Sequence, residues 1–95
     1  MKNSILSVCI PTYNRSGILR ENLLLMLPEL KKFSIPIYVS DDSPDKETEN
    51  MISELQQRYE FIYYSKNIPS LGHDKNIFNT LNQPNTDYVW LLGDS

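Results

Sequence analysis

The feature that most constrains the fold of this chain is a regular alternation of short apolar runs with segments of helical pattern. The four apolar runs are rich in β-branched and aromatic residues and span 5–10, 35–40, 61–64 and 88–92. The first run is almost continuously apolar, which is typical of a strand that is covered on both faces. Strands that alternate with helices predict an α/β fold with a parallel sheet, right-handed crossovers and flanking helices.

Each segment between the apolar runs carries a start signal for a helix. Ser16-Gly17 opens the first helix, which Pro28 should kink or end because proline removes a backbone donor and crowds the preceding turn. Ser43-Pro44 resembles an N-cap followed by proline in the first helical position, and predicts the start of the second helix. The third helix is expected over 72–81. The predicted buried faces of the three helices are Leu19, Leu23, Met26 and Leu30; Ile52, Leu55 and Tyr59; and Ile77, Phe78 and Leu81.

Length and composition indicate one small globular domain. The 95 residues are 40% hydrophobic and carry a net charge of −3, so no basic surface for nucleic acid is expected. The single cysteine, Cys9, excludes an internal disulfide framework and reads as an inert buried thiol. No apolar stretch is long enough to span a bilayer or to form a signal peptide. These features favour a cytoplasmic protein, with peripheral attachment at the inner membrane face as an alternative.

Ligands of open parallel sheets bind beyond the carboxyl ends of the strands, and polar residues follow all four predicted strands. Each group also has a plainer interpretation. Asp41-Asp42 could be favourable charge at a helix N-terminus, and Tyr13-Asn14 could be ordinary turn residues. Gly93-Asp94-Ser95 could be a plain turn, and the lone His73 could be a loop residue. The argument for a site is that all these groups fall on one edge of one predicted sheet.

Several well-known sites are excluded by their missing motifs. No G-x-G-x-x-G follows the first strand, no G-x-x-x-x-G-K-[ST] occurs, and there is no G-x-S-x-G. A receiver domain would need its acidic pair after the first strand, whereas this pair follows the second.

Four motifs in order resemble glycosyltransferase family 2, whose members have the GT-A fold. The first two are Ser7-Val8-Cys9-Ile10-Pro11-Thr12-Tyr13-Asn14-Arg15 and Val39-Ser40-Asp41-Asp42-Ser43-Pro44-Asp45, the latter similar to V-D-D-G-S-x-D. The third runs from Asn67 to Asn76 and resembles N-x-G-x-x-x-A-R-N. The fourth, Tyr88 to Ser95, looks like the strand that leads into a D-x-D motif. Its Leu-Leu-Gly-Asp ending, together with Gly-His-Asp-Lys-Asn at 72–76, resembles abequosyltransferase-like members.

The resemblance implies a Rossmann-like, nucleotide-binding half of a GT-A domain with strand order 3-2-1-4, here a single, truncated domain over 1–95. It implies that Tyr13 packs near the nucleobase and that Asp41 or Asp42 accepts a hydrogen bond from the base ring. Asp94 would be the first D-x-D carboxylate and would contact the ribose or a bound Mn²⁺ or Mg²⁺. The implied nucleotide-binding set is Pro11, Thr12, Tyr13, Asn14, Arg15, Asp41, Asp42, Gly72, Lys75, Asn76 and Asp94, with Asp94 as the metal ligand.

The implied reaction is transfer of a sugar from a nucleotide-diphosphate donor to a saccharide or lipid-linked acceptor, in polysaccharide or glycolipid synthesis. No residue here matches the position of the family's catalytic base, so the chain alone is expected to be inactive. Three departures are the missing glycine after the acidic pair, Lys75 in place of arginine, and Asp74 in place of a small residue. The alternative is a non-catalytic nucleotide-binding or regulatory α/β module. The apolar fourth strand, as an edge strand, also predicts self-association.

Overall fold

The four apolar runs form the four strands of one parallel sheet. In the computed structural model, which describes residues 5–93, the strands are β1 (Leu6–Thr12), β2 (Ile37–Asp41), β3 (Ile62–Lys66) and β4 (Tyr88–Leu91). Their order in the sheet is β3-β2-β1-β4, and all three pairings are parallel. The predicted fold class and strand order are therefore confirmed.

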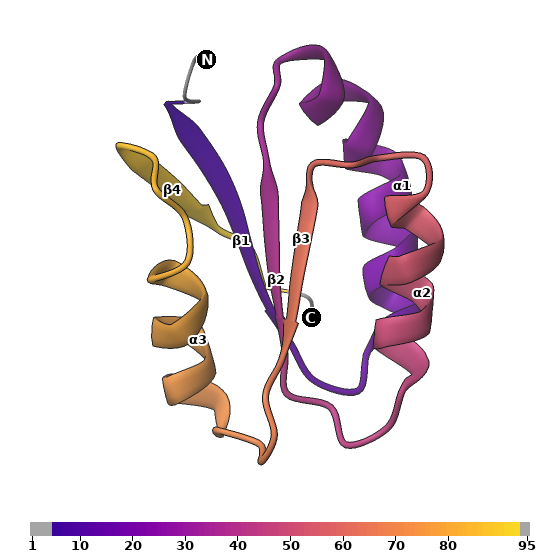
Figure 1. Ribbon diagram of the computed structural model, residues 1–95, viewed down its shortest axis with the longest axis vertical. Helices are drawn as coiled ribbons and strands as arrows, with labels where there is room; N and C mark the ends of the chain where they lie inside the picture. Colours follow the sequence, from indigo (N-terminus) through magenta and orange to yellow (C-terminus); the bar gives the residue numbers. More distant parts are fainter. Residues whose placement is uncertain (1–4, 94–95) are drawn as a thin grey trace.

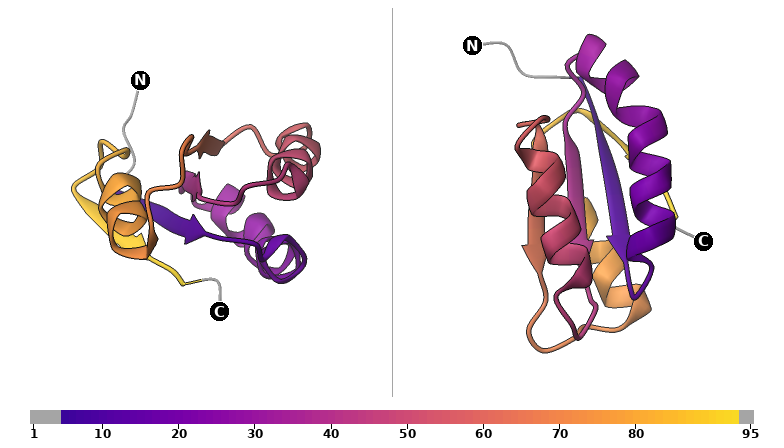
Figure 2. Two further views of the ribbon diagram at one scale, coloured as in Figure 1. Left: turned by 90° about the horizontal axis from the view of Figure 1, so that it is seen from below. Right: turned by 90° about the vertical axis from the view of Figure 1, so that its right-hand side faces the viewer.

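Three helices connect the strands and cover both faces of the sheet. They are α1 (Ser16–Lys32), α2 (Glu47–Gln56) and α3 (His73–Leu81). Helices α1 and α2 lie side by side on one face, and α3 lies alone on the other (Figure 1, Figure 2). This arrangement is the one that right-handed crossovers produce when the chain first moves outward from β1 to β3 and then returns to add β4.

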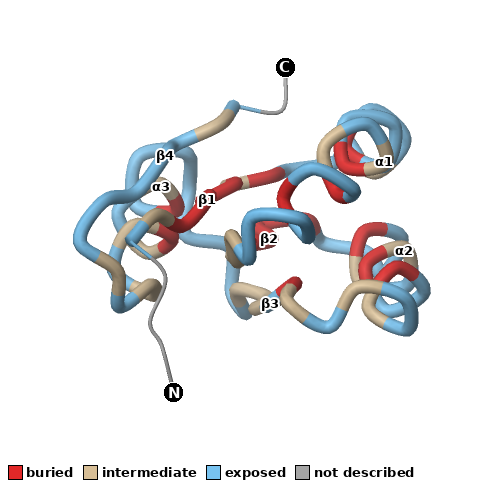
Figure 3. Tube along the Cα trace, turned by 90° about the horizontal axis from the view of Figure 1, so that it is seen from above, coloured by how far each residue is buried: buried red, intermediate tan, exposed pale blue. Residues whose placement is uncertain are grey.

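The apolar core lies between the sheet and the pair α1 and α2. Leu19, Leu23, Leu27 and Leu30 recur at helical spacing along α1 and are all buried. In Figure 3 the buried segments follow β1 and the sides of α1 and α2 that face the sheet. Burying one such leucine contributes about 1.5–3 kcal/mol relative to leaving it exposed. The buried cluster is completed from the strands and α2 by Val8, Ile10, Ile37, Val39, Ile52, Leu55 and Ile62.

Strands β1, β2 and β3 run further toward their carboxyl ends than the apolar runs indicate. Thr12 pairs with Asp41, and Asp41 in turn pairs with Lys66, so polar residues form the last rung of the sheet. Backbone pairing continues there because the ladder needs only amide and carbonyl groups, whatever the side chains. The extension places Thr12 and Asp41 within strands and brings the residues that follow them to one edge.

The structure corrects two expectations about helix boundaries, namely the end of the first helix at Pro28, which was one of two outcomes expected there, and the start of the second helix. Helix α1 does not end at Pro28 but continues to Lys32, since the buried leucines on either side of the exposed proline hold the helix against the sheet. Helix α2 begins at Glu47 and not at Ser43-Pro44. The Ser43 hydroxyl accepts a hydrogen bond from the Asn14 backbone N–H instead, and Asp45 Oδ1 accepts from the Glu47 N–H at 3.1 Å.

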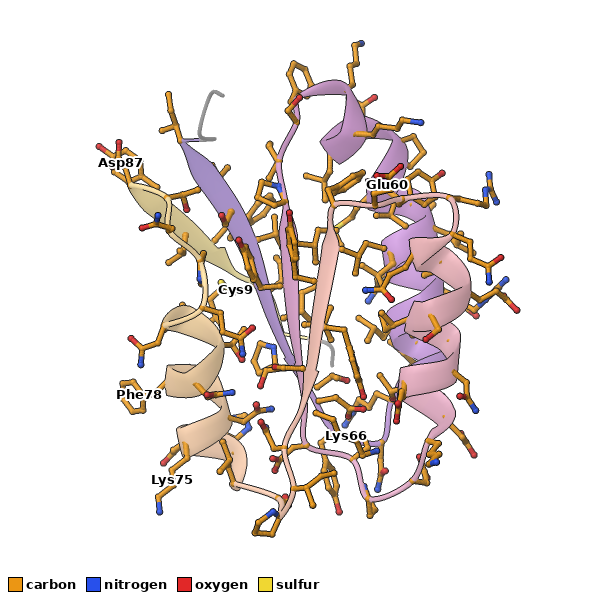
Figure 4. The ribbon with its side chains drawn as sticks, in the orientation of Figure 1. Cys9, Glu60, Lys66, Lys75, Phe78 and Asp87 are labelled. Atoms are coloured by element: carbon orange, nitrogen blue, oxygen red, sulfur yellow. The ribbon has the colours of Figure 1, made fainter. Side chains whose placement is uncertain are left out.

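The predicted apolar face of α3 is also wrong. Its buried residues are Asn76 and Thr80, whereas Phe78 is 67% exposed and points away from the sheet (Figure 4). The strand end beneath α3 presents polar groups, and Asn76 Nδ2 donates to the Ser40 carbonyl oxygen at 3.1 Å. An amide side chain satisfies that buried carbonyl, which an isoleucine or phenylalanine could not.

Strand β4 forms one edge of the sheet, as predicted. Its four residues, Tyr88, Val89, Trp90 and Leu91, are all exposed. It pairs with β1 from Leu6↔Tyr88 to Cys9↔Leu91. Within residues 5–93, no helix is long and apolar enough to cross a membrane.

Candidate functional site

A cavity of about 670 Å³ opens beyond the carboxyl ends of β1 and β2. It lies at the point where the chain reverses direction across the sheet, which is where open parallel sheets bind ligands. Its volume falls within the range of about 300–1,000 Å³ that small-molecule sites occupy. The cavity is lined by Pro11, Thr12, Tyr13, Arg15, Asp42, Ser70, Gly72, His73, Asn76 and Gly93.

One wall of the cavity is the short loop between β1 and α1. Asn14 in this loop has φ = 53°, a left-handed conformation that asparagine tolerates better than most residues. The Asn14 N–H donates to the Ser43 hydroxyl at 2.7 Å, which ties the loop to the segment after β2. On either side of this tie, Tyr13 is 54% exposed and Arg15 is exposed. The wall therefore presents an aromatic ring and a permanent positive charge to the cavity.

Asp41, at the end of β2, has both carboxylate oxygens engaged inside the protein. It is completely buried, and its Oδ1 accepts from the Ser43 N–H at 2.9 Å. Its Oδ2 accepts from the Tyr64 hydroxyl at 2.6 Å. Burial and the Asp41 carboxylate together raise the pKa of Tyr64 well above its ordinary value, so this hydroxyl remains a donor. Asp41 does not line the cavity.

Asp42 lies on the opposite wall, where it holds the segment that leads into α3. Its Oδ1 accepts from the Leu71 N–H at 2.7 Å and from Asn67 Nδ2 at 3.0 Å. Its Oδ2 accepts from the Gly72 N–H at 2.9 Å and from the Ser70 hydroxyl. Burial raises the pKa of Asp42, but these four hydrogen bonds outweigh it and leave the pKa below its ordinary value of 3.8. Asp42 is therefore an ionised acceptor at neutral pH.

A cluster of amide and hydroxyl groups beneath α3 supports this wall. Asn76 Oδ1 accepts from the Ser40 hydroxyl at 2.6 Å and from Asn67 Nδ2 at 2.9 Å. Asn79 Nδ2 donates to the Ser40 hydroxyl oxygen at 2.9 Å. Since Ser40 and Asn76 are buried, these bonds fix α3 to β2 with little competition from water. Asn76 reaches the cavity, but its amide is committed to the protein.

Of the eleven predicted residues, seven line the cavity, three lie elsewhere, and one falls outside the described residues. Asn14 lines an adjoining, more open depression beside the start of α1, which shares Tyr13 and Arg15 with the cavity, and Asp41 is buried. Lys75 is exposed on the outer side of α3 (Figure 4), and Asp94 lies outside the described residues. Asp42 and Thr12 lie side by side at the carboxyl edge of the sheet, where the Asp42 N–H donates to the Thr12 carbonyl oxygen at 2.9 Å.

Three cavity residues were not predicted: Ser70, His73 and Gly93. Ser70 and His73 flank Gly72, whose φ of 90° turns the chain into α3. Gly72 was predicted because it follows the third strand, and the same reasoning could have predicted that the nearby Ser70 and His73 line the cavity. His73 is the first residue of α3 rather than a loop residue.

The described residues do not by themselves make a metal site. Over residues 5–93, no three histidine, cysteine or carboxylate groups gather in a way that could hold a cation. Asp42, the carboxylate at the cavity, is occupied by four protein donors. Asp94, the metal ligand that the resemblance implies, lies outside the described residues.

Chemically, the cavity suits a ligand with a flat aromatic part and an anionic part. Tyr13 offers a ring face for stacking, and Arg15 offers a guanidinium for charge-assisted hydrogen bonds to phosphate. The Asp42 carboxylate is stabilised by neutral N–H and O–H donors and keeps its negative charge, so the anionic part of a ligand is favoured on the side of Arg15.

Comparison with known proteins agrees with this geometry. The profile for Glycosyl transferase family 2 matches residues 7–94. The chain is also 39% identical, over 92 residues, to abequosyltransferase RfbV of Salmonella typhimurium, an alignment that covers 94% of this chain and 27% of that protein. The chain thus spans about a quarter of the length of the curated relative that it matches. From the family profile, the identity to this relative and the parallel α/β fold together, the chain belongs to glycosyltransferase family 2.

Proposed function

We propose that this chain is the donor-binding part of a glycosyltransferase and that the cavity holds the nucleoside diphosphate of a nucleotide sugar. The observation that carries the proposal is the pairing of Tyr13 and Arg15 on one wall of a ligand-sized cavity, at the carboxyl edge of the sheet. The base stacks on Tyr13, and the diphosphate lies within reach of Arg15. Thr12, Pro11 and Gly72 complete the surface against the nucleoside.

The whole protein transfers the sugar to a saccharide or lipid-linked acceptor in cell-envelope polysaccharide or glycolipid synthesis, in the cytoplasm. The relative is named for abequosyl transfer, which supports a donor of that kind. A divalent cation at Asp94 belongs to this proposal, and no step described here depends on it.

Binding of UDP, CDP, GDP and dTDP, followed by calorimetry, tests the donor site. We expect one of them to bind with a Kd on the order of 0.1–1 mM, which corresponds to about −4 to −5.5 kcal/mol. Tyr13→Ala should weaken binding about tenfold or more, since stacking of a base on an aromatic ring contributes about 1–3 kcal/mol. The matched control is Tyr63→Ala, because Tyr63 is 50% exposed on β3, away from the cavity.

Arg15→Ala distinguishes the contribution of the diphosphate to binding from that of the nucleoside. It should weaken binding of the diphosphate, and should leave binding of the free nucleoside unchanged, because only the former carries charge for the guanidinium. Arg20→Ala is its control, since Arg20 is an exposed arginine on α1 that pairs with Glu54 at 3.8 Å. If none of the four nucleotides binds at millimolar concentration, the donor-site proposal fails.

A non-catalytic nucleotide-binding or regulatory α/β module is the second candidate, because the cavity residues suit nucleotide binding with or without transfer. Both candidates bind nucleotide, but only the enzyme releases nucleoside diphosphate from a nucleotide sugar in the presence of acceptor. Turnover by this chain alone would contradict the assignment of no catalytic residue to it.

Self-association through β4 stays a prediction, which a light-scattering series over protein concentration tests.

A further inference from the structure

The hydroxyl group of Ser43 holds the loop between β1 and α1. Ser43 directly follows the acidic pair after β2 and is 1% exposed, whereas residues 13–15 of the loop are exposed. The Ser43 Oγ accepts a hydrogen bond from the Asn14 backbone N–H at 2.7 Å, across 29 residues of sequence. This distance lies at the short end of the range for an N–H donor. A buried side chain therefore fixes one backbone amide of an exposed loop.

The position of the Ser43 hydroxyl is set by the strand end and not by the loop. The Ser43 N–H donates to Asp41 Oδ1 at 2.9 Å, and Asp41 is 0% exposed. The other oxygen of Asp41 accepts from the Tyr64 hydroxyl on β3 at 2.6 Å. Bonds of this kind are strong in a buried setting, because water does not compete for the same groups. Ser43 is thus a fixed point to which the loop is attached.

The attachment falls on the residue whose backbone determines the direction of the loop. Asn14 has φ = 53°, a left-handed conformation that non-glycine residues seldom adopt. Such a conformation persists where surrounding contacts hold it. The neighbours of Asn14 on either side are Tyr13 and Arg15, and both line the cavity. A change of conformation at Asn14 would redirect both side chains at once.

A second side-chain contact near the loop is weaker. The Ser16 hydroxyl donates to Glu47 Oε1 at 3.3 Å, and this bond is exposed to water. Because water competes for exposed polar groups, the bond to Ser43 contributes more to the conformation of the loop.

We propose that Ser43 is a positioning residue for the donor site, and that its hydroxyl holds Asn14 in the turn that presents Tyr13 and Arg15 to the cavity. The inference rests on the proposed donor site. Of the described residues, those that line the cavity do not include Ser43, so it acts through the loop and not through the ligand. The pattern V-D-D-G-S-x-D has glycine directly after the acidic pair, and a glycine at position 43 would have no hydroxyl for this bond.

Ser43→Ala removes the acceptor for the Asn14 N–H. The affinity for the tightest-binding of UDP, CDP, GDP and dTDP should fall about three- to tenfold. The affinity for the free nucleoside should fall by a similar factor, because Tyr13 moves together with Arg15. This result would differ from that of Arg15→Ala, which should leave nucleoside binding unchanged. Unchanged affinity of Ser43→Ala for both ligands would overturn the inference.

Ser7→Ala is the matched control for the loss of a buried serine hydroxyl. Ser7 is 0% exposed near the start of β1, and its Oγ accepts from the Thr86 hydroxyl at 2.8 Å. The cavity lies beyond the other end of β1. Both variants should lower the Tm, but at a temperature where both are folded only Ser43→Ala should lose affinity. An equal loss of affinity in both would indicate general destabilisation and would overturn the inference.

Amide hydrogen exchange provides a readout that needs neither nucleotide nor, in its first step, a variant. The Asn14 amide should be protected in the wild-type chain, and an unprotected Asn14 amide would overturn the inference. In Ser43→Ala it should exchange about tenfold faster or more, while the Leu71 amide, which donates to Asp42 at 2.7 Å, keeps its protection. Faster exchange at Asn14 in a chain that binds no nucleotide would uphold the role of Ser43 in the loop and refute the donor site alone.

Discussion

The hydroxyl of Tyr64 is the most informative single group to remove, because its partner is the buried Asp41 carboxylate. Water cannot reach that carboxylate to replace a lost hydrogen bond. The hydroxyl donates to Asp41 Oδ2 at 2.6 Å, and Asp41 is 0% exposed. Tyr64→Phe deletes this donor and keeps the ring, so the packing of β3 is preserved. The remaining partner of the carboxylate, the Ser43 N–H, bonds to the other oxygen.

The expected cost follows from the charge and burial of the acceptor. Hydrogen bonds to charged groups contribute about 1.5–3 kcal/mol, and a buried acceptor left without a donor loses that amount because water does not replace it. We therefore expect the free energy of unfolding to fall by about 2 kcal/mol. For a domain of this size, each kcal/mol corresponds to about 4–8 °C, so the Tm should fall by about 8–16 °C.

Thermal and urea unfolding, followed by far-ultraviolet circular dichroism, measure this loss. The control is Tyr63→Phe, which removes the hydroxyl of a half-exposed neighbour on the same strand and should change the free energy of unfolding by less than about 0.5 kcal/mol. If Tyr64→Phe costs no more than the control, the Asp41 carboxylate is hydrated or differently paired. That result would refute the inference that the Asp41 carboxylate is shielded from water and depends on the Tyr64 hydroxyl and the Ser43 N–H for its hydrogen bonds.

Three further predictions concern titration and packing. Because the folded-state pKa of Asp42 lies below its ordinary value of 3.8, its contribution to stability is present above that pH and is lost as the pH falls below it. The difference in unfolding free energy between wild type and Asp42→Asn should thus shrink in acid. Burial raises the pKa of Cys9 to about 11, above the value of about 8.5 for a free thiol, so a thiol reagent at a pH of about 8 should label it only after denaturant is added. Leu23→Ala, at a completely buried position, should cost about 2–5 kcal/mol, whereas Leu25→Ala on the same helix, at 80% exposure, should cost less than about 0.5 kcal/mol.

The strands were predictable because the signals for them are local or follow general rules, whereas their order was implied by the resemblance to the family. A continuous apolar run such as Val8 to Ile10 needs cover on both faces, and parallel strands need crossover helices on each side. The edge that carries the cavity followed from the same rules, since ligands bind beyond the carboxyl ends of the strands. Seven of the eleven predicted residues reach the cavity for that reason.

The errors arose where a residue's partner is distant in the sequence. Ser43-Pro44 has the local pattern of a helix start, but the Ser43 hydroxyl accepts from Asn14, 29 residues away. The apolar residues of α3 have helical spacing, but the helix turns Asn76 inward because the buried Ser40 carbonyl and hydroxyl need partners. Ser70 was missed because only its contact with Asp42 brings it to the cavity.

The adjacent carboxylates of Asp41 and Asp42 support different parts of the cavity. Side chains of consecutive residues in extended chain point to opposite sides, so Asp41 and Asp42 reach different neighbours. Through Ser43, Asp41 supports the loop that carries Tyr13, since the Ser43 N–H donates to Asp41 and its hydroxyl accepts from the next loop residue. Asp42 supports the facing wall through Gly72. The acidic pair at this strand end thus supports two segments that line the cavity, the loop after β1 through Asp41 and Ser43 and the start of α3 through Asp42.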